Sequence, residues 1–251
     1  MSPQGEYIYG IAEEPHFKRF SFPGIGNADV YTINYKRTAA VVSDTEFTEI
    51  DPTRKNVQAH TITQEELMKE YNLLPMGFGM VATGEGEVRG LLENNYDGLL
   101  GELHRLAGRI EVELKVFWEQ EAVMKEIQGE SQELSRLKAK LNVASSPVEV
   151  RNLLVEGGKL VENIVCDWKT RYAEMIYSIL QKLSYEAKMN NPMGIKNLLN
   201  ASFLIEKSRE SEFKRQVYEL DARFQGKMNI KYVGPLPPYN FVTLKLEPVK
   251  C

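Results

Sequence analysis

The chain has 251 residues, of which 43% are hydrophobic and 26% charged, the proportions of an ordinary globular protein. This length suits one large domain or two modest ones. No stretch approaches the roughly 18 apolar residues that a membrane span needs, and the polar, acidic start predicts no signal peptide. Two isolated cysteines, Cys166 and Cys251, favour a reducing, cytoplasmic compartment.

The net charge of −4 argues against nucleic acid as the main partner, because phosphate contacts need a basic surface. The charge is uneven along the chain. Residues 1–106 carry a net charge of −7 and residues 107–251 a net charge of +3. This asymmetry is consistent with two domains that meet different partners or each other, and equally with chance variation between two solvated surfaces.

The N-terminal part is predicted to contain strands followed by helices. Residues 7–11, 30–35 and 39–42 are rich in β-branched and aromatic side chains and predict strands, the last two as an antiparallel pair. Residues 22–27 predict a turn or loop from their Gly, Pro and Asn content. A helix is expected from Asp51 to about Tyr71.

The next segment, residues 73–82, is apolar but broken by Pro and Gly, which predicts a buried loop leading into a strand. Helices are expected from Thr83 through Leu92 and then to about Leu106. The glycines after Thr83 follow the spacing G-x-G-x-x-x-G, which is not that of a dinucleotide loop. A capped helix start after a tight turn is the simpler interpretation.

Beyond Arg109 apolar and charged side chains alternate strictly through Val116, a pattern that is typical of a half-buried strand. Helical sequence follows, with a break expected at Gly129. Ser146-Pro147 is a strong helix start, and the apolar pattern continues towards Lys188. Such a helix would span roughly 60 Å, which exceeds the width of one small domain. Because glycine disfavours the helix, a bend or break is expected at the Gly-Gly pair 157–158.

The remaining elements are a strand at 198–205, a helix capped by Ser208 and ending near Gly226, and a strand at 228–232. The order of elements favours an α+β fold with a ferredoxin-like split βαβ unit carrying long helices. We therefore expect an N-terminal α+β domain at 1–107, a C-terminal ferredoxin-like domain at 108–233 and a Pro-rich tail at 234–251.

A search for catalytic chemistry finds no candidate. His16, His60 and His104 lie far apart, without metal-ligand spacing, and are expected to be exposed or capping residues. No nucleophile elbow, phosphate loop or C-x-x-C pair occurs, and the many carboxylate pairs have no apolar pocket around them. We therefore predict no catalytic, cofactor-binding or metal-binding residue.

The tail is the remaining candidate site, because three prolines and two aromatic side chains make a stiff, extended segment. It either docks on another domain or chain or packs back onto its own protein. The candidate partner-binding residues are Pro235, Leu236, Pro237, Pro238, Tyr239 and Phe241.

Several segments in the same order resemble the GvpF/GvpL family of gas vesicle proteins, and its F-type branch in particular. They are residues 7–11 (Tyr-Ile-Tyr-Gly-Ile), residues 39–43, His60, residues 74–79 (Leu-Pro-Met-Gly-Phe-Gly), residues 108–111 and residues 234–241. Each motif alone is weak, but the ordered set covers most of the chain.

The resemblance implies two α+β domains and a non-catalytic accessory or minor structural protein of gas vesicles, without cofactor. It implies that the partners are the major shell protein (GvpA-type) and other accessory proteins, with no lipid membrane. The expected location is the cytoplasm, at the gas-facing side of the vesicle wall.

A shell subunit with an apolar face aggregates unless that face is covered, so we expect the C-terminal domain and tail to cover it. Deleting residues 234–251 should then weaken binding without unfolding the protein. The alternatives are a cytoplasmic chaperone that is not retained in the mature vesicle, and a small-molecule-binding α+β enzyme or sensor.

Overall fold

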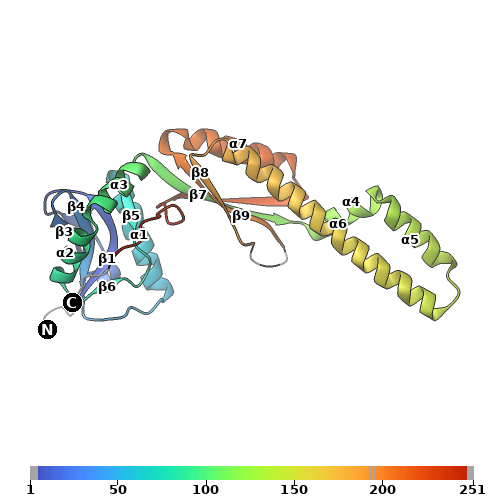
Figure 1. Cartoon of the computed structure of the whole chain (residues 1–251), viewed down its shortest axis with the longest axis horizontal. Coiled ribbons are helices and arrows are strands. Elements are labelled where there is room, and N and C mark those ends of the chain that lie inside the picture. The colour runs from blue at the N-terminus through green and yellow to red at the C-terminus, as the bar shows by residue number, and fades with distance from the viewer. Residues whose placement is uncertain (1–4, 193, 195, 248–251) are drawn as a thin grey trace. The chain divides into compact units, whose positions relative to one another are not determined.

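The computed structural model describes residues 5–192, 194 and 196–247 (Figure 1). The chain divides into two compact units. Unit 1 comprises Met1–Glu111, Leu204–Ser208 and Gly234–Cys251, and unit 2 comprises Val112–Phe203 and Arg209–Val233. The first boundary lies close to the predicted one at residue 107, but the tail belongs with unit 1. The last residues of the predicted tail, 248–251 with Cys251, lie outside the described residues.

Unit 1 is built on a six-stranded sheet of order β2-β3-β4-β1-β5, with β6 paired to β1. The predicted antiparallel pairing of β3 and β4 is confirmed, since Val30 lies opposite Ser43 and Tyr35 opposite Thr38. The strands are β1 (Gly5–Glu13), β2 (Arg19–Pro23), β3 (Asp29–Tyr35), β4 (Thr38–Thr45), β5 (Leu73–Pro75) and β6 (Val81–Ala82).

Helices cover both faces of this sheet. Successive side chains of β1 point to opposite faces, and both faces carry apolar side chains that a helix buries. Tyr7 and Tyr9 belong to one buried cluster, together with Leu67 of α1. Ile8 belongs to the other, together with Leu92 and residues of α3. The helices are α1 (Arg54–Glu70), α2 (Glu85–Asn94) and α3 (Tyr96–Leu106), with a short 3-10 turn, η1 (Ile25–Asn27), between β2 and β3.

Unit 2 carries a four-stranded sheet of order β10-β7-β9-β8. Its strands are β7 (Arg109–Trp118), β8 (Glu186–Asn190), β9 (Asn197–Glu206) and β10 (Met228–Leu236). Its helices are α4 (Gln120–Glu130), α5 (Gln132–Val143), α6 (Pro147–Gln181) and α7 (Glu210–Arg223). The break between α4 and α5 falls at Ser131, whose hydroxyl accepts from the N–H of Leu134 at 3.2 Å, rather than at the predicted Gly129.

Aromatic side chains pack α6 and α7 on one face of this sheet. The ring of Phe203 on β9 lies 5.7 Å from that of Tyr177 on α6 and 5.4 Å from that of Phe213 on α7. Trp118 on β7 contacts Trp168 on α6, with ring centroids 6.2 Å apart. The core of unit 2 therefore lies between the sheet and the C-terminal half of α6.

Helix α6 runs unbroken through Gly157 and Gly158, so the predicted bend or break is wrong. Its 35 residues span about 52 Å. The apolar spacing continues on both sides of the glycines, and the helix there packs against α5, which outweighs a helix-propensity cost of about 1 kcal/mol per glycine. The helix ends at Gln181 and not near Lys188, because residues 186–190 form β8 instead.

Replacing Gly158 by Ala is expected to raise the free energy of unfolding of unit 2 by about 0.5–1 kcal/mol. A Cβ at this position meets no atom within 4 Å. Urea denaturation followed by tryptophan fluorescence measures it, since both tryptophans lie in unit 2. The matched control is Gly226→Ala, expected to destabilise because Gly226 has φ +81°. Loss of stability in Gly158→Ala would contradict the unbroken helix.

Candidate functional site

The tail packs against the α2–α3 face of unit 1. Phe241 is fully buried in the cluster that contains Leu92, Leu99 and Leu103. Leu244 approaches α3 so closely that a Cβ added at Gly98 would lie 2.9 Å from its Cδ1. Glycine at this position of α3 therefore makes room for the tail.

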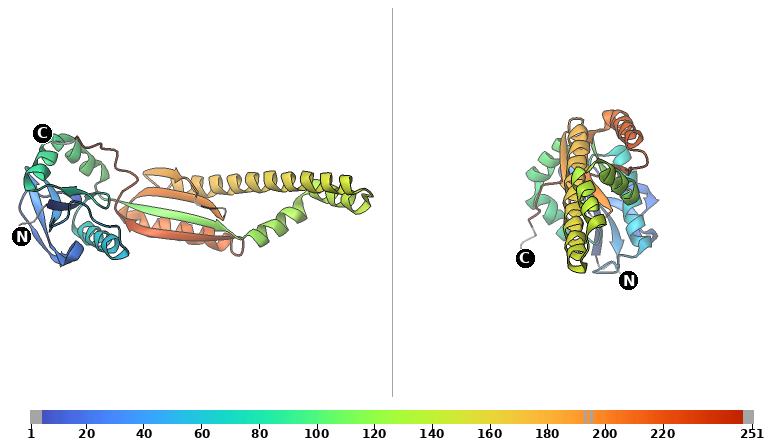
Figure 2. Two further views of the ribbon diagram at one scale, coloured as in Figure 1. Left: turned by 90° about the horizontal axis from the view of Figure 1, so that it is seen from below. Right: turned by 90° about the vertical axis from the view of Figure 1, so that its right-hand side faces the viewer.

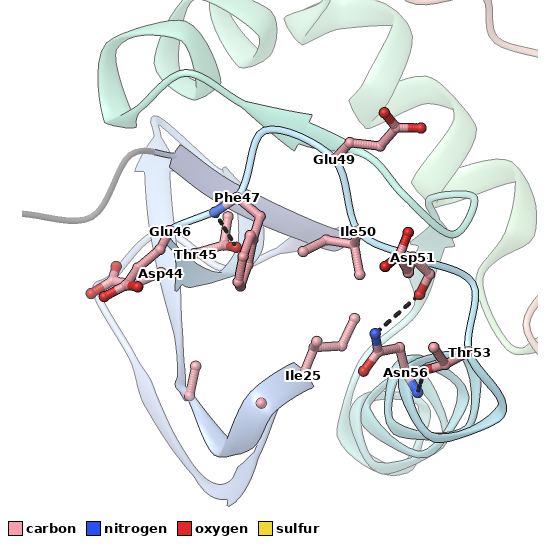
Figure 3. A pocket seen from close by; sticks show the side chains of 12 residues that line it. Ile25, Asp44, Thr45, Glu46, Phe47, Glu49, Ile50, Asp51, Thr53 and Asn56 are labelled. Atoms are coloured by element: carbon pink, nitrogen blue, oxygen red, sulfur yellow. Dashed lines mark hydrogen bonds between the residues drawn. The ribbon is translucent and has the colours of Figure 1, made fainter.

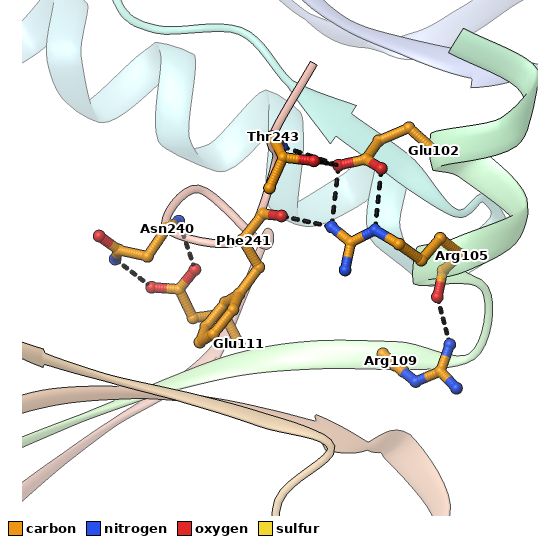
Figure 4. Close-up of polar contacts among 7 residues, drawn as sticks. All are labelled: Glu102, Arg105, Arg109, Glu111, Asn240, Phe241 and Thr243. Atoms are coloured by element: carbon orange, nitrogen blue, oxygen red, sulfur yellow. Dashed lines mark hydrogen bonds and ion pairs between the residues drawn. The ribbon is translucent and has the colours of Figure 1, made fainter. Parts of the chain in front are cut away.

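An ion pair on α3 holds the tail backbone (Figure 4). Two N–H groups of Arg105 donate to the two carboxylate oxygens of Glu102, each at 2.8 Å. Arg105 also donates to the carbonyl of Phe241. Glu102 accepts from the N–H of Thr243 at 2.8 Å and from its hydroxyl at 3.2 Å. This pair therefore binds the tail on both sides of Val242.

The environment of Glu102 favours its charged form. The hydrogen bond from Arg105, together with the N–H of Thr243, lowers the pKa of Glu102 to about 2, against the opposing effect of burial. Charge-assisted bonds of this kind are stronger than neutral ones. The carboxylate of Glu102, which holds the tail, therefore stays ionised at neutral and mildly acidic pH.

Two further polar groups anchor the tail. Glu111 at the start of β7 is fully buried and accepts from the backbone N–H of Asn240 at 2.8 Å and from its side-chain amide. Asn95 donates to the carbonyl of Glu247 at 3.1 Å and accepts from its N–H at 2.8 Å. The backbone is therefore bound at four separate residues, from Asn240 to Glu247.

Tyr239 joins the tail to α1. Its hydroxyl donates to Oε1 of Gln64, whose amide in turn donates to the carbonyls of Tyr9 at 2.7 Å and Met76 at 3.0 Å. Burial raises the pKa of Tyr239 to about 12, so the hydroxyl stays protonated and can donate. This chain of bonds runs from the tail to the first strand of unit 1.

The candidate residues of the tail divide into two groups. Pro237, Pro238 and Phe241 are buried, and Pro235, Leu236 and Tyr239 keep exposed surface. The described part of the tail thus packs back onto its own chain, the second of the two outcomes expected from the sequence. Partner binding by the tail stays a prediction.

His60 is buried, at 3% exposure, which corrects the expectation that all three histidines are exposed or capping. Its Nδ1 lies 2.9 Å from the hydroxyl of Tyr7, and its ring stacks on Tyr9 at 5.8 Å. Burial lowers the pKa of His60, so the ring is neutral and forms part of the core. His16 and His104 are exposed as predicted.

An acidic hollow of about 580 Å³ opens elsewhere on unit 1 (Figure 3). It is formed by η1, the loop after β4 and the start of α1. Four of its lining residues are carboxylates: Asp44, Glu46, Glu49 and Asp51. Sequence reasoning missed this hollow, although four acidic residues and Phe47 within positions 44–51 were a visible signal.

Unit 2 exposes apolar side chains on the helical hairpin formed by α5 and α6, which lie side by side (Figure 2). Leu134 is the only residue of α5 that is buried, and α6 has no buried residue before Trp168. Four apolar residues of the hairpin are more than half exposed: Val143, Val148, Leu154 and Val155. The two helices therefore leave apolar surface uncovered.

Neither a metal site nor a membrane-spanning helix is present in the part of the chain that the structure describes. Within residues 5–192, 194 and 196–247, no group of three or more His, Cys, Asp or Glu side chains is arranged to hold a metal ion. None of the helices formed by these residues combines the length and the apolar character needed to cross a bilayer.

The sequence matches the family described as gas vesicle synthesis protein GvpL/GvpF over residues 5–243. The chain belongs to the GvpL/GvpF family. It is 27% identical over 243 residues to gas vesicle protein F of a Nostoc species, covering 96% of this chain and 98% of that protein. Gas vesicle protein L of Haloferax mediterranei is 23% identical, covering 88% of this chain and 73% of that protein.

Solved structures of the family have the same fold. The crystal structure of GvpF from an Anabaena species matches with a TM-score of 0.82 and 27% identity, covering 96% of this chain and 99% of that one. That of GvpF from Microcystis aeruginosa matches with a TM-score of 0.77 and 23% identity, covering 96% and 100%. The family resemblance read from the sequence is confirmed, as is the α+β class, and the family implies a role in gas vesicle formation.

Proposed function

We propose that this protein is a non-catalytic accessory factor of gas vesicle assembly, which binds the major shell subunit through the α5–α6 hairpin. The family assignment supports the vesicle role. The observation that carries the binding role is the uncovered apolar surface of the hairpin, with Val143, Val148, Leu154 and Val155 more than half exposed. Exposed apolar surface of this kind marks interaction sites.

The physical task is to keep an apolar subunit in solution until it joins the wall. Each Å² of apolar surface removed from water contributes about 25 cal/mol, so the binding free energy grows with the apolar area that the contact covers. Amphipathic helices commonly bind a partner by laying an apolar face against it. Pro235, Leu236 and Tyr239 of the tail, which are exposed or partly exposed, are a second contact in this proposal.

The strand order supports a finer description of unit 2. Its elements follow in the order β7-α6-β8-β9-α7-β10, with the α4–α5 insertion before α6, and the sheet order is β10-β7-β9-β8. We propose that this is a ferredoxin-like fold, in which each helix crosses one face of the sheet between two of the strands. The hairpin is then an extension of the first crossover helix.

Charged substitutions on the hairpin test the binding role. In a pull-down with purified shell subunit, the full-length Leu154→Lys/Val155→Glu variant is expected to retain at least tenfold less subunit than the wild type. Both side chains are exposed, so the fold is expected to stay within about 0.5 kcal/mol. The control is Val57→Lys/Ile62→Glu on α1, the same kind of change at two exposed apolar positions. Equal retention by both variants contradicts the assignment.

The place of the protein in the cell is proposed as the cytoplasm and the gas-facing side of the vesicle wall, with other accessory proteins as further partners. A chaperone that leaves before the wall is complete is the second candidate, favoured by the same apolar surface. Proteomics of washed vesicles separates the two, since only a wall component stays with the shell.

A further inference from the structure

We propose that the acidic hollow of unit 1 is a docking site for a segment of another protein in which a lysine or arginine lies beside an apolar side chain. The hollow is lined by η1, the loop after β4 and the first turn of α1 (Figure 3). It does not rest on the proposed shell contact, which involves the α5–α6 hairpin and the tail, and none of whose residues lines the hollow. The two proposals therefore stand or fall separately.

The floor of the hollow is apolar. Ile25 and Ile50 both pack into the buried cluster around Tyr9, and Ile50 is 8% exposed. Phe47 is 64% exposed and lines the same hollow, with its backbone N–H bonded to the hydroxyl of Thr45 at 3.2 Å. A large aromatic ring beside an apolar floor gives a partner's apolar side chain a place to lie.

The rim carries one sign of charge. Asp44, Glu46, Glu49 and Asp51 are all exposed, and the lining residues include no lysine or arginine. The hydroxyl of Tyr31 donates to Asp44 at 2.6 Å but brings no positive charge. Asp44 and Glu46 lie on one side of the hollow and Glu49 and Asp51 on the other (Figure 3), so the rim attracts a cation of the partner from both sides.

Arg54 and Lys55 follow in the first turn of α1, although they are not among the lining residues. The residues that line the hollow therefore include no cation. A lysine or arginine of the partner can also lie over the face of Phe47, which adds a cation–π contact of about 0.5–1 kcal/mol at an exposed site.

The openness of the site favours a protein segment over a small molecule. The four carboxylates, Phe47 and Thr53 are all exposed, so the walls do not enclose a ligand. Small-molecule sites bury most of the ligand surface, whereas a short peptide segment can rest in an open hollow and keep its backbone in water. A volume of about 580 Å³ accommodates a few side chains of such a segment.

Fluorescence anisotropy with a synthetic peptide tests the proposal. The probe is a labelled amphipathic helical peptide with lysines on one face and leucines on the other. It is titrated with the full-length protein at physiological salt. The double variant Glu46→Gln/Glu49→Gln is expected to weaken binding at least tenfold, and Phe47→Ala with the carboxylates intact at least threefold. All three positions are exposed, so the fold is expected to remain and is checked by circular dichroism.

The matched control is Glu65→Gln/Glu174→Gln, which removes the same charge from exposed positions outside the hollow. An equal loss in this control would show that the peptide binds the protein's overall charge, and the proposal would be wrong. Equal binding of a peptide with glutamate in place of lysine would also overturn it. So would a self-associated form of this chain that dissociates in Glu46→Gln/Glu49→Gln, because the occupant would then be a second copy.

Discussion

Phe241→Ala is expected to lower the free energy of unfolding of unit 1 by about 3–5 kcal/mol. The side chain has no exposed surface and fills the cluster between the sheet and α2–α3, so its removal loses buried area and leaves a cavity. Unit 1 contains no tryptophan, so amide hydrogen exchange or near-ultraviolet circular dichroism of its tyrosines is the measurement.

Phe47→Ala is the matched control, the same change at a side chain that is 64% exposed, and is expected to alter stability by less than about 0.5 kcal/mol. A small effect of Phe241→Ala would show that the tail is only loosely attached. The burial of Phe241 also contradicts the expectation that residues 234–251 can be deleted without unfolding the protein, because the deletion opens the core of unit 1.

Glu102→Gln is expected to lower the free energy of unfolding at pH 7 by about 2–3 kcal/mol. The folded-state pKa of Glu102 is about 2, below its ordinary value of 4.5. A lowered pKa stabilises the folded state fully above pH 4.5, and this contribution is lost as the pH falls from about 4.5 to 2. The wild type and the variant are therefore expected to converge in stability over that interval.

The measurement is urea denaturation of both proteins at a series of pH values. Hydrogen exchange of the amides in unit 1 monitors the unfolding. Glu46→Gln serves as the control, since Glu46 is exposed, and its effect is expected to stay within about 0.5 kcal/mol. If the difference in the free energy of unfolding between wild type and Glu102→Gln stayed constant down to pH 2, the stabilisation would not come from the ion pair of Glu102 with Arg105.

Local patterns predicted many of the elements. Alternation from Arg109 to Val116 predicted a strand, and β7 runs from Arg109 to Trp118. The Ser146-Pro147 start of α6 is confirmed, with the Ser146 hydroxyl accepting from the N–H of Glu149 at 3.1 Å. Both signals depend on neighbouring residues only, which is why they can be read without the fold.

Other elements were missed because their local signal is weak or opposite. Strand β8 (Glu186–Asn190) contains Glu, Ala, Lys and Asn, residues that favour helix or turn, and it forms a strand because β9 offers it a pairing edge. Strand β2 carries Phe20 and Phe22 at alternate positions, but Pro23 at its end and the Gly after it suggested a loop. His60 was missed because its burial depends on Tyr7 and Tyr9 of β1.

The family, the α+β class and the strands and helices with strong periodicity follow from the order of residues alone, because hydrophobic period and capping are local properties. The fold alone decided that the tail is held within unit 1, that Glu102 and Glu111 bind its backbone, and that acidic residues near Phe47 surround one hollow. Glu102 and Thr243 are far apart in the sequence, and only tertiary packing brings such groups to hydrogen-bond distance.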